Sequence, residues 1–181
     1  GGIPGGRHGV TGFSTGWPVA MLPLAPRGPG EAQDSDMAGR IAGEAWPLHC
    51  YGMVGVGRNV SPDTGSGAEL YVVIGQAPRQ LDRNIALVGR VIEGIEYLSS
   101  LPRGTGELGF YRTAAERTPI LSVRMGSEVA GLPTYEYLFT GSDSFAAFAD
   151  KRANRKDEFY IRPAGGVDVC NVPVPIRVAK R

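Results

Sequence analysis

The sequence predicts a mainly β fold with few helices. Short runs rich in β-branched and aromatic residues recur through the middle of the chain, and Gly, Pro and Asp separate them. Only two longer stretches, 93–101 and 144–155, carry the spacing or the start signals of helices. With 181 residues, the protein can bury a hydrophobic core in one domain with an appendage.

The N-terminal residues 1–45 are rich in Gly, Pro, Ala and Ser and have only short apolar runs. Because proline interrupts a helix, the prolines of this part exclude a long one. We therefore predict an irregular segment with at most one short strand near Val19–Leu24. We also predict one or two turns of helix within the stretch 34–46.

The middle of the chain carries the clearest strand signals. Small and apolar residues alternate in 51–57, and β-branched and aromatic residues fill 68–75. A second buried strand is expected over 85–92. The spacing then becomes helical in 93–101 and alternates again in 118–129, which predicts a helix followed by a further strand.

Residues 127–181 form the expected C-terminal extension, packed on the rest of the protein. Ser142 or Asp143 can cap a helix of about 10–15 residues. Near the end, Pro173 and Pro175 confine the backbone to a sheet edge or a surface path, because proline lacks the N–H that a central strand needs.

Composition excludes several kinds of partner. The 19 Lys and Arg residues nearly balance the 18 Asp and Glu residues, which leaves a formal net charge of +1. We therefore expect no nucleic-acid partner and no attraction to an acidic membrane surface. Because no run of 18 apolar residues occurs, the sequence predicts no membrane-spanning helix. We expect a monomer that needs no cofactor.

The two cysteines, Cys50 and Cys170, lie 120 residues apart, and neither belongs to a CxxC pair. His8 and His49 add no four-ligand pattern, so the sequence predicts no metal site. The cysteines are either two buried thiols or a long-range disulfide that ties the extension to the rest of the protein. A disulfide would indicate an oxidising compartment such as a bacterial periplasm.

Residues 48–101 contain a series of motifs in a definite order. "LHCYGMVGVGRN" is followed by "PDTGSGAELYVVIG" and then by "RQLDRNIALVGRVIEGIEYLSSL". This order and spacing resemble the second half of a cyclophilin-type peptidyl-prolyl cis-trans isomerase. The resemblance implies an antiparallel β-barrel over 46–126, capped by a helix. It also implies an enzyme that assists protein folding by rotating X-Pro bonds of polypeptide substrates.

The resemblance assigns a substrate groove to residues that match the family's peptide-binding positions. These residues are Val56, Gly57, Arg58, Asn59, Glu69, Tyr71, Leu81 and Ile85. Glu69 stands where the family has Gln, Tyr71 where it has Phe, and Ile85 where it often has His. Structural interpretations remain open beside this one: the apolar residues as core, Glu69 as a solvated strand charge, and 58–59 as a loop tip.

The catalytic residue is not assigned. The resembling family uses an Arg in an F-x-R motif, which donates to the proline nitrogen as the amide twists. No such motif precedes residue 46. Residues 1–4 resemble the turn that follows the F-x-R strand in the family, so we expect an N-terminally shortened sequence. "FYR" at 110–112 matches the motif but follows the predicted helix, and a surface hairpin is the alternative interpretation of these residues. Arg58 is a candidate to replace the missing catalytic Arg.

Three functions stay open at this point. The favoured one is a peptidyl-prolyl isomerase that acts on proline-containing polypeptides. The second is a catalytically weak module that binds proline peptides without the catalytic Arg. The third is an interaction protein whose extension, 127–181, carries the function.

Overall fold

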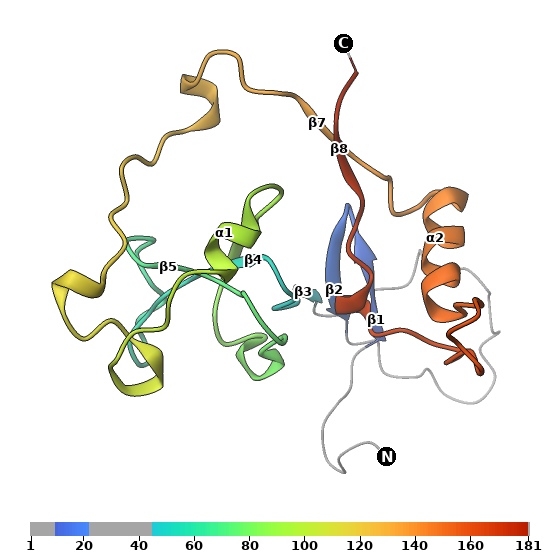
Figure 1. Ribbon diagram of the computed structural model, residues 1–181, viewed down its shortest axis with the longest axis horizontal. Helices are drawn as coiled ribbons and strands as arrows, with labels where there is room; N and C mark the ends of the chain where they lie inside the picture. Colours follow the sequence, from blue (N-terminus) through green and yellow to red (C-terminus); the bar gives the residue numbers. More distant parts are fainter. Residues whose placement is uncertain (1–9, 22–44, 181) are drawn as a thin grey trace, which may run out of the picture.

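Three small antiparallel sheets hold the strands of this protein in the computed structural model, which describes residues 10–21 and 45–180. The first sheet contains β1 (Val10–Ser14), β2 (Trp17–Met21) and β3 (Ala45–Pro47). The second has the order β5 (Leu70–Val72), β4 (Met53–Val56) and β6 (Leu87–Arg90). The third pairs β7 (Tyr135–Tyr137) with β8 (Ile176–Val178). The class is mainly β, but the described residues form separate sheets rather than the expected closed barrel (Figure 1).

The hairpin of β1 and β2 lies in a segment that the sequence predicts to be irregular. A two-residue turn joins the strands, and the φ angles of Thr15 and Gly16 are 46° and 84°. Two positive φ angles in succession match the right-handed twist of paired strands, and glycine adopts such an angle without steric cost. The irregular-segment prediction for 1–45 is therefore wrong for residues 10–18, since it allowed a strand only near Val19–Leu24.

The other N-terminal expectations fall partly outside the described residues. The short strand expected near Val19–Leu24 overlaps β2, which ends at residue 21, and the remainder lies outside the described part. Of the helical turn expected in 34–46, only Ala45 and Trp46 are described. Both belong to β3, so the expected helix does not extend to these two residues.

The second sheet forms where the sequence predicts strands, although each strand is shorter than its apolar run. β4 lies within 51–57, and β5 and β6 lie within the two runs that follow. Gly55 of β4 is paired with Tyr71 of β5. A Cβ at Gly55 would come within 2.2 Å of the Tyr71 ring, so glycine lets that ring lie directly against the strand.

Two helices occupy the predicted positions. α1 (Ile95–Ser99) is shorter than the stretch 93–101, and α2 (Asp143–Ala153) has the expected length. The Ser142 hydroxyl accepts a hydrogen bond from the backbone N–H of Phe145 at 3.2 Å, which caps α2. In the part of the chain that the structure describes, no helix is long and apolar enough to cross a membrane.

Loss of this cap gives a first prediction. We expect Ser142→Ala to lower the free energy of unfolding by about 1 kcal/mol, because the Phe145 N–H loses its acceptor. Ser144→Ala is the matched control, since Ser144 is exposed inside the same helix and alanine favours helices. Urea unfolding followed by circular dichroism measures both variants. Equal stability of the two variants would show that the cap contributes nothing.

Among the described residues the hydrophobic core has two clusters, and the C-terminal segment contributes to both. The first contains Ala20, Leu48, Cys50, Met53, Val73 and Val169. The second contains Phe145, Val172 and Val174, and the Phe13 ring packs edge-to-face on Phe145 with centroids 4.9 Å apart. The sequence predicts the two prolines at a sheet edge or on a surface path. Pro173 is exposed and β8, which follows Pro175, pairs only with β7 among the described strands, but Val172 and Val174 on either side of Pro173 are buried.

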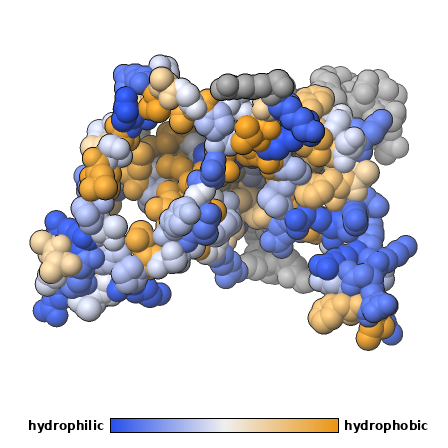
Figure 2. All heavy atoms as spheres, turned by 45° about the horizontal axis from the view of Figure 1, so that its top comes forward, coloured by the Kyte–Doolittle hydropathy of each residue, from blue (hydrophilic) through white to orange (hydrophobic). Residues whose placement is uncertain are grey.

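A long exposed segment connects α1 to β7 along the periphery of the molecule (Figure 1). Every residue from 117 to 128 is exposed, including the apolar Ile120, Leu121 and Val123. The strand predicted over 118–129 is absent there, and only a short 3₁₀ turn at Gly126–Glu128 occurs. Alternation alone does not make a strand, because the backbone also needs a paired neighbour. On the face of the molecule that Figure 2 shows, apolar and hydrophilic residues lie interspersed.

Candidate functional site

A buried hydrogen-bond network joins β5 to the turn before β6. His49 is fully buried, and its Nδ1 lies 2.9 Å from Oδ1 of Asp82. The backbone N–H of His49 donates to the same oxygen, and Arg79 Nε donates to the other carboxylate oxygen. On the opposite side of the ring, His49 Nε2 lies 2.7 Å from the Tyr71 hydroxyl oxygen.

The chemistry of these groups fixes the direction of the hydrogen bond between His49 and Asp82. The Asp82 carboxylate can only accept, so His49 Nδ1 carries the proton. The second hydrogen bond joins His49 Nε2 to the Tyr71 hydroxyl, which donates when the ring is neutral. Burial and, secondly, the nearby Asp82 charge raise the pKa of Tyr71, which keeps its hydroxyl protonated. The network therefore holds the loop 76–84 against β5.

A hollow of about 440 Å³ opens between β3, the end of β4 and the residues that lead into β6. Its apolar lining comes from Trp46, Pro47, Ile85, Ala86 and Leu87. Its polar lining comes from Arg58, Thr64, Arg83 and Asn84. This hollow combines an apolar surface with two guanidinium groups, a composition that suits a mostly apolar ligand with hydrogen-bond acceptors.

Local contacts orient both guanidinium groups. Arg58 Nε donates to the Asn84 carbonyl at 2.9 Å, and its Nη1 donates to the Asn59 carbonyl at 2.6 Å. The Arg83 guanidinium lies 4.8 Å from the centroid of the Trp46 ring, within the range of a cation–π interaction. A guanidinium carries five N–H groups, so Arg58 has further donors for a bound amide.

The structure brings two of the sequence-predicted site residues, Arg58 and Ile85, into this hollow. Val56 is the last residue of β4 and Gly57 follows it, and both lie beside β5. The Gly57 N–H donates to the Glu69 carbonyl at 2.8 Å. Asn59 is exposed in a loop, and its N–H donates to Asp63.

The other predicted residues lie elsewhere. The lining of the hollow does not include Glu69, Tyr71 or Leu81. Tyr71 is half-buried, packs on the first core cluster and directs its hydroxyl to His49. Leu81 ends the 3₁₀ turn Arg79–Leu81, one residue before Asp82, so Tyr71 and Leu81 belong to the buried network and its support.

The F-x-R sequence at 110–112 lies in an exposed loop. The Gly106 N–H donates to the Phe110 carbonyl, which closes the loop. The Glu116 carboxylate accepts hydrogen bonds from the backbone N–H and the hydroxyl of Thr105 and from the backbone N–H of Arg112. These bonds, those from Thr105 most of all, lower the pKa of Glu116 to about 2. Arg112 is exposed and does not line the hollow.

Sequence reasoning missed four residues of this site: Arg79, Asp82, Trp46 and Arg83. The "LDR" motif at 81–83 signals the importance of Asp82, but nothing local pairs it with a histidine 33 positions earlier. The contact between Arg83 and Trp46 likewise depends on how β3 packs beside the turn.

Comparison with known proteins adds no assignment. No protein-family model matches this sequence, and no curated protein matches it.

Proposed function

We propose that the protein is a peptidyl-prolyl cis-trans isomerase of the cyclophilin type that assists protein folding. The motif order over 48–101 supports this proposal. The observation that carries it is the hollow in which the Arg58 guanidinium lies beside apolar residues, because prolyl isomerisation needs that combination.

The barrier to rotation about an X-Pro bond comes from the partial double bond of the amide. A catalyst lowers this barrier by binding the twisted amide more tightly than the planar one. In our proposal the proline ring lies against Ile85 and Leu87. An Arg58 N–H then donates to the proline nitrogen, whose lone pair becomes available only when conjugation is lost.

A binding module without strong catalysis is the second candidate. The contacts of Arg58 favour it, because the carbonyls of Asn59 and Asn84 hold the guanidinium and restrict its movement towards a substrate. Such a module would recognise proline-containing segments in the same hollow and release them without faster rotation.

Exchange NMR of a short Ala-Pro peptide tests the proposal and separates the two candidates. We expect the protein to accelerate cis-trans exchange, and Arg58→Met to reduce the acceleration on the order of a hundredfold while peptide affinity changes much less. Arg112→Met is the matched control, because Arg112 is exposed and also ends an F-x-R sequence. Thermal unfolding checks that both variants stay folded.

The outcomes differ clearly. Peptide binding at Arg58 and Ile85 without faster exchange favours the binding module. A rate loss in Arg112→Met with none in Arg58→Met moves the catalytic role to residue 112. Absence of both binding and acceleration rejects a proline-directed function.

We further propose that the protein works in an oxidising compartment such as a bacterial periplasm. The support is the Cys50–Cys170 disulfide, whose Cα atoms lie 5.0 Å apart. Structural disulfides persist in oxidising compartments and are rare in the reducing cytosol.

A further inference from the structure

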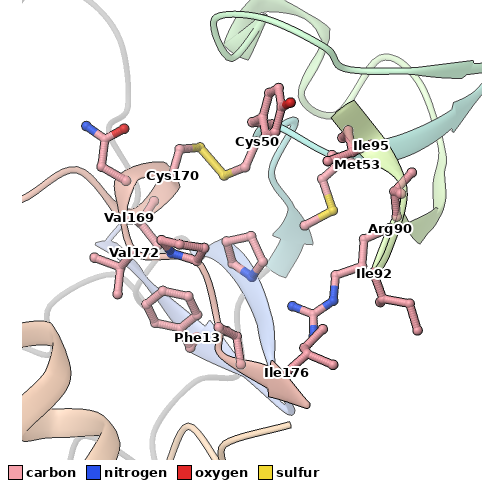
Figure 3. A pocket seen from close by; sticks show the side chains of 17 residues that line it. Phe13, Cys50, Met53, Arg90, Ile92, Ile95, Val169, Cys170, Val172 and Ile176 are labelled. Atoms are coloured by element: carbon pink, nitrogen blue, oxygen red, sulfur yellow. A yellow bond between two sulfur atoms is a disulfide. The ribbon is translucent and has the colours of Figure 1, made fainter. Parts of the chain in front are cut away.

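A second cavity lies between β4, α1 and the C-terminal segment before β8, and it shares no lining residue with the hollow. Its volume is about 510 Å³, within the roughly 300–1,000 Å³ typical of small-molecule sites. Most of its wall is apolar and includes Phe13, Met53, Ile95, Val172, Val174 and Ile176. The Cys50–Cys170 disulfide lies at one end, and the Arg90 guanidinium extends towards the other (Figure 3).

Arg90 is the only charged residue among the described residues that line this cavity. Its Nη1 donates to the Gly16 carbonyl at 3.0 Å, and none of the described carboxylates forms an ion pair with it. Partial burial lowers the pKa of Arg90 from its ordinary value, yet an arginine stays protonated at neutral pH. The Tyr137 hydroxyl acts on this pKa in the opposite direction. The cavity therefore carries a fixed positive charge that no described carboxylate neutralises.

We propose that this cavity binds a small ligand in which a carboxylate is attached to an apolar body. The carboxylate would accept from the Arg90 guanidinium, and the apolar body would lie along Met53 and Val174. A charge-assisted hydrogen bond is stronger than a neutral one, and a guanidinium can bind both carboxylate oxygens. The apolar wall adds affinity in proportion to the apolar area that it removes from water.

A purely structural role explains only part of the arrangement. The bond from Arg90 to the Gly16 carbonyl ties β6 to the turn between β1 and β2. One N–H group suffices for that bond, and a neutral side chain would provide it at lower desolvation cost. A charged group beside an apolar cavity is what recognition of an anion requires.

Binding of decanoate at pH 7, below its micelle concentration, tests the proposal under non-reducing conditions. We expect saturable binding by calorimetry and NMR shifts at Met53, Ile95 and Arg90. Arg90→Met, which keeps an apolar stem, should weaken binding by about tenfold or more. Arg177→Met is the matched control and should bind as the wild type does, because Arg177 is exposed and pairs with Glu136 on the third sheet.

Two further probes identify which chemical groups of the ligand the site recognises. Methyl decanoate has the same apolar body without the charge, and equal binding of the ester would overturn the proposal. N-acetyl-leucyl-leucine carries a carboxylate on a peptide, so preference for it over decanoate would assign the site to polypeptide carboxyl termini, and the reverse to fatty acids.

A second variant keeps the proposal testable if Arg90→Met fails to fold. Ile95→Trp adds volume inside the cavity and leaves Arg90 in place, so it should also block decanoate. Decanoate binding that survives both Arg90→Met and Ile95→Trp would overturn the proposal.

Discussion

Reduction of the Cys50–Cys170 disulfide is expected to lower the free energy of unfolding by about 5 kcal/mol, because the bond closes a loop across 120 residues. Cys50 belongs to the first core cluster, and Cys170 follows the buried Val169 of the same cluster. The bond therefore constrains the unfolded protein and holds the C-terminal segment against the core. Because domains of this size are stable by only about 5–15 kcal/mol, the loss should be large in relative terms.

Guanidinium unfolding with and without reductant, followed by tryptophan fluorescence, measures this effect. The double variant Cys50→Ala/Cys170→Ala is the control and should unfold at the same concentration under both conditions. Mass measurement of the untreated protein should find no free thiol. Two reactive thiols, or an unchanged midpoint on reduction, would contradict the prediction.

Asp82→Ala is expected to cost about 3–5 kcal/mol of unfolding free energy, because it removes one partner of a buried charged network. The Asp82 side chain is 8% exposed and accepts from the His49 backbone N–H, from His49 Nδ1 and from Arg79. In the variant the two His49 donors would stay buried without an acceptor. Asp82→Asn keeps the shape and one acceptor oxygen, so its loss should be smaller.

Asp157→Ala is the matched control, because Asp157 also pairs with a nearby arginine, Arg155, but at the surface. We expect little change in stability from it, since solvent screens exposed ion pairs. Urea unfolding compares the variants, and the NMR signal of the His49 Nδ1 proton should disappear in Asp82→Ala. Equal stability losses for Asp82→Ala and Asp157→Ala would contradict the network's role.

The elements that could be predicted from the sequence are those with local causes. α2 forms where Ser142 provides a cap, and β5 lies inside its run of β-branched and aromatic residues. The strand expected in 118–129 fails because pairing needs a neighbour that the alternation cannot supply. The β1–β2 hairpin could not be predicted because the turn at Thr15-Gly16 does not stand out among the many glycines around it.

The candidate site was predictable only where a motif marks it. The resemblance assigns Arg58 and Ile85 to the groove, and both line the hollow, while their role in binding stays a prediction. The contacts of Asp82 with His49 and of Arg83 with Trp46 join residues that are far apart in sequence. Such pairs depend on tertiary packing, which neither spacing nor composition encodes directly.

The exposed segment 117–128 lies between Cys50 and Cys170 in the sequence, and this order has a topological consequence. A protease that cuts the segment divides the protein into two polypeptides, one with Leu48 and Met53 and the other with Val169 and Phe145. The disulfide still joins them, and no residue of either core cluster lies in the cut segment. The protein can therefore persist as a covalent two-chain molecule, whose halves separate only when the bond is reduced.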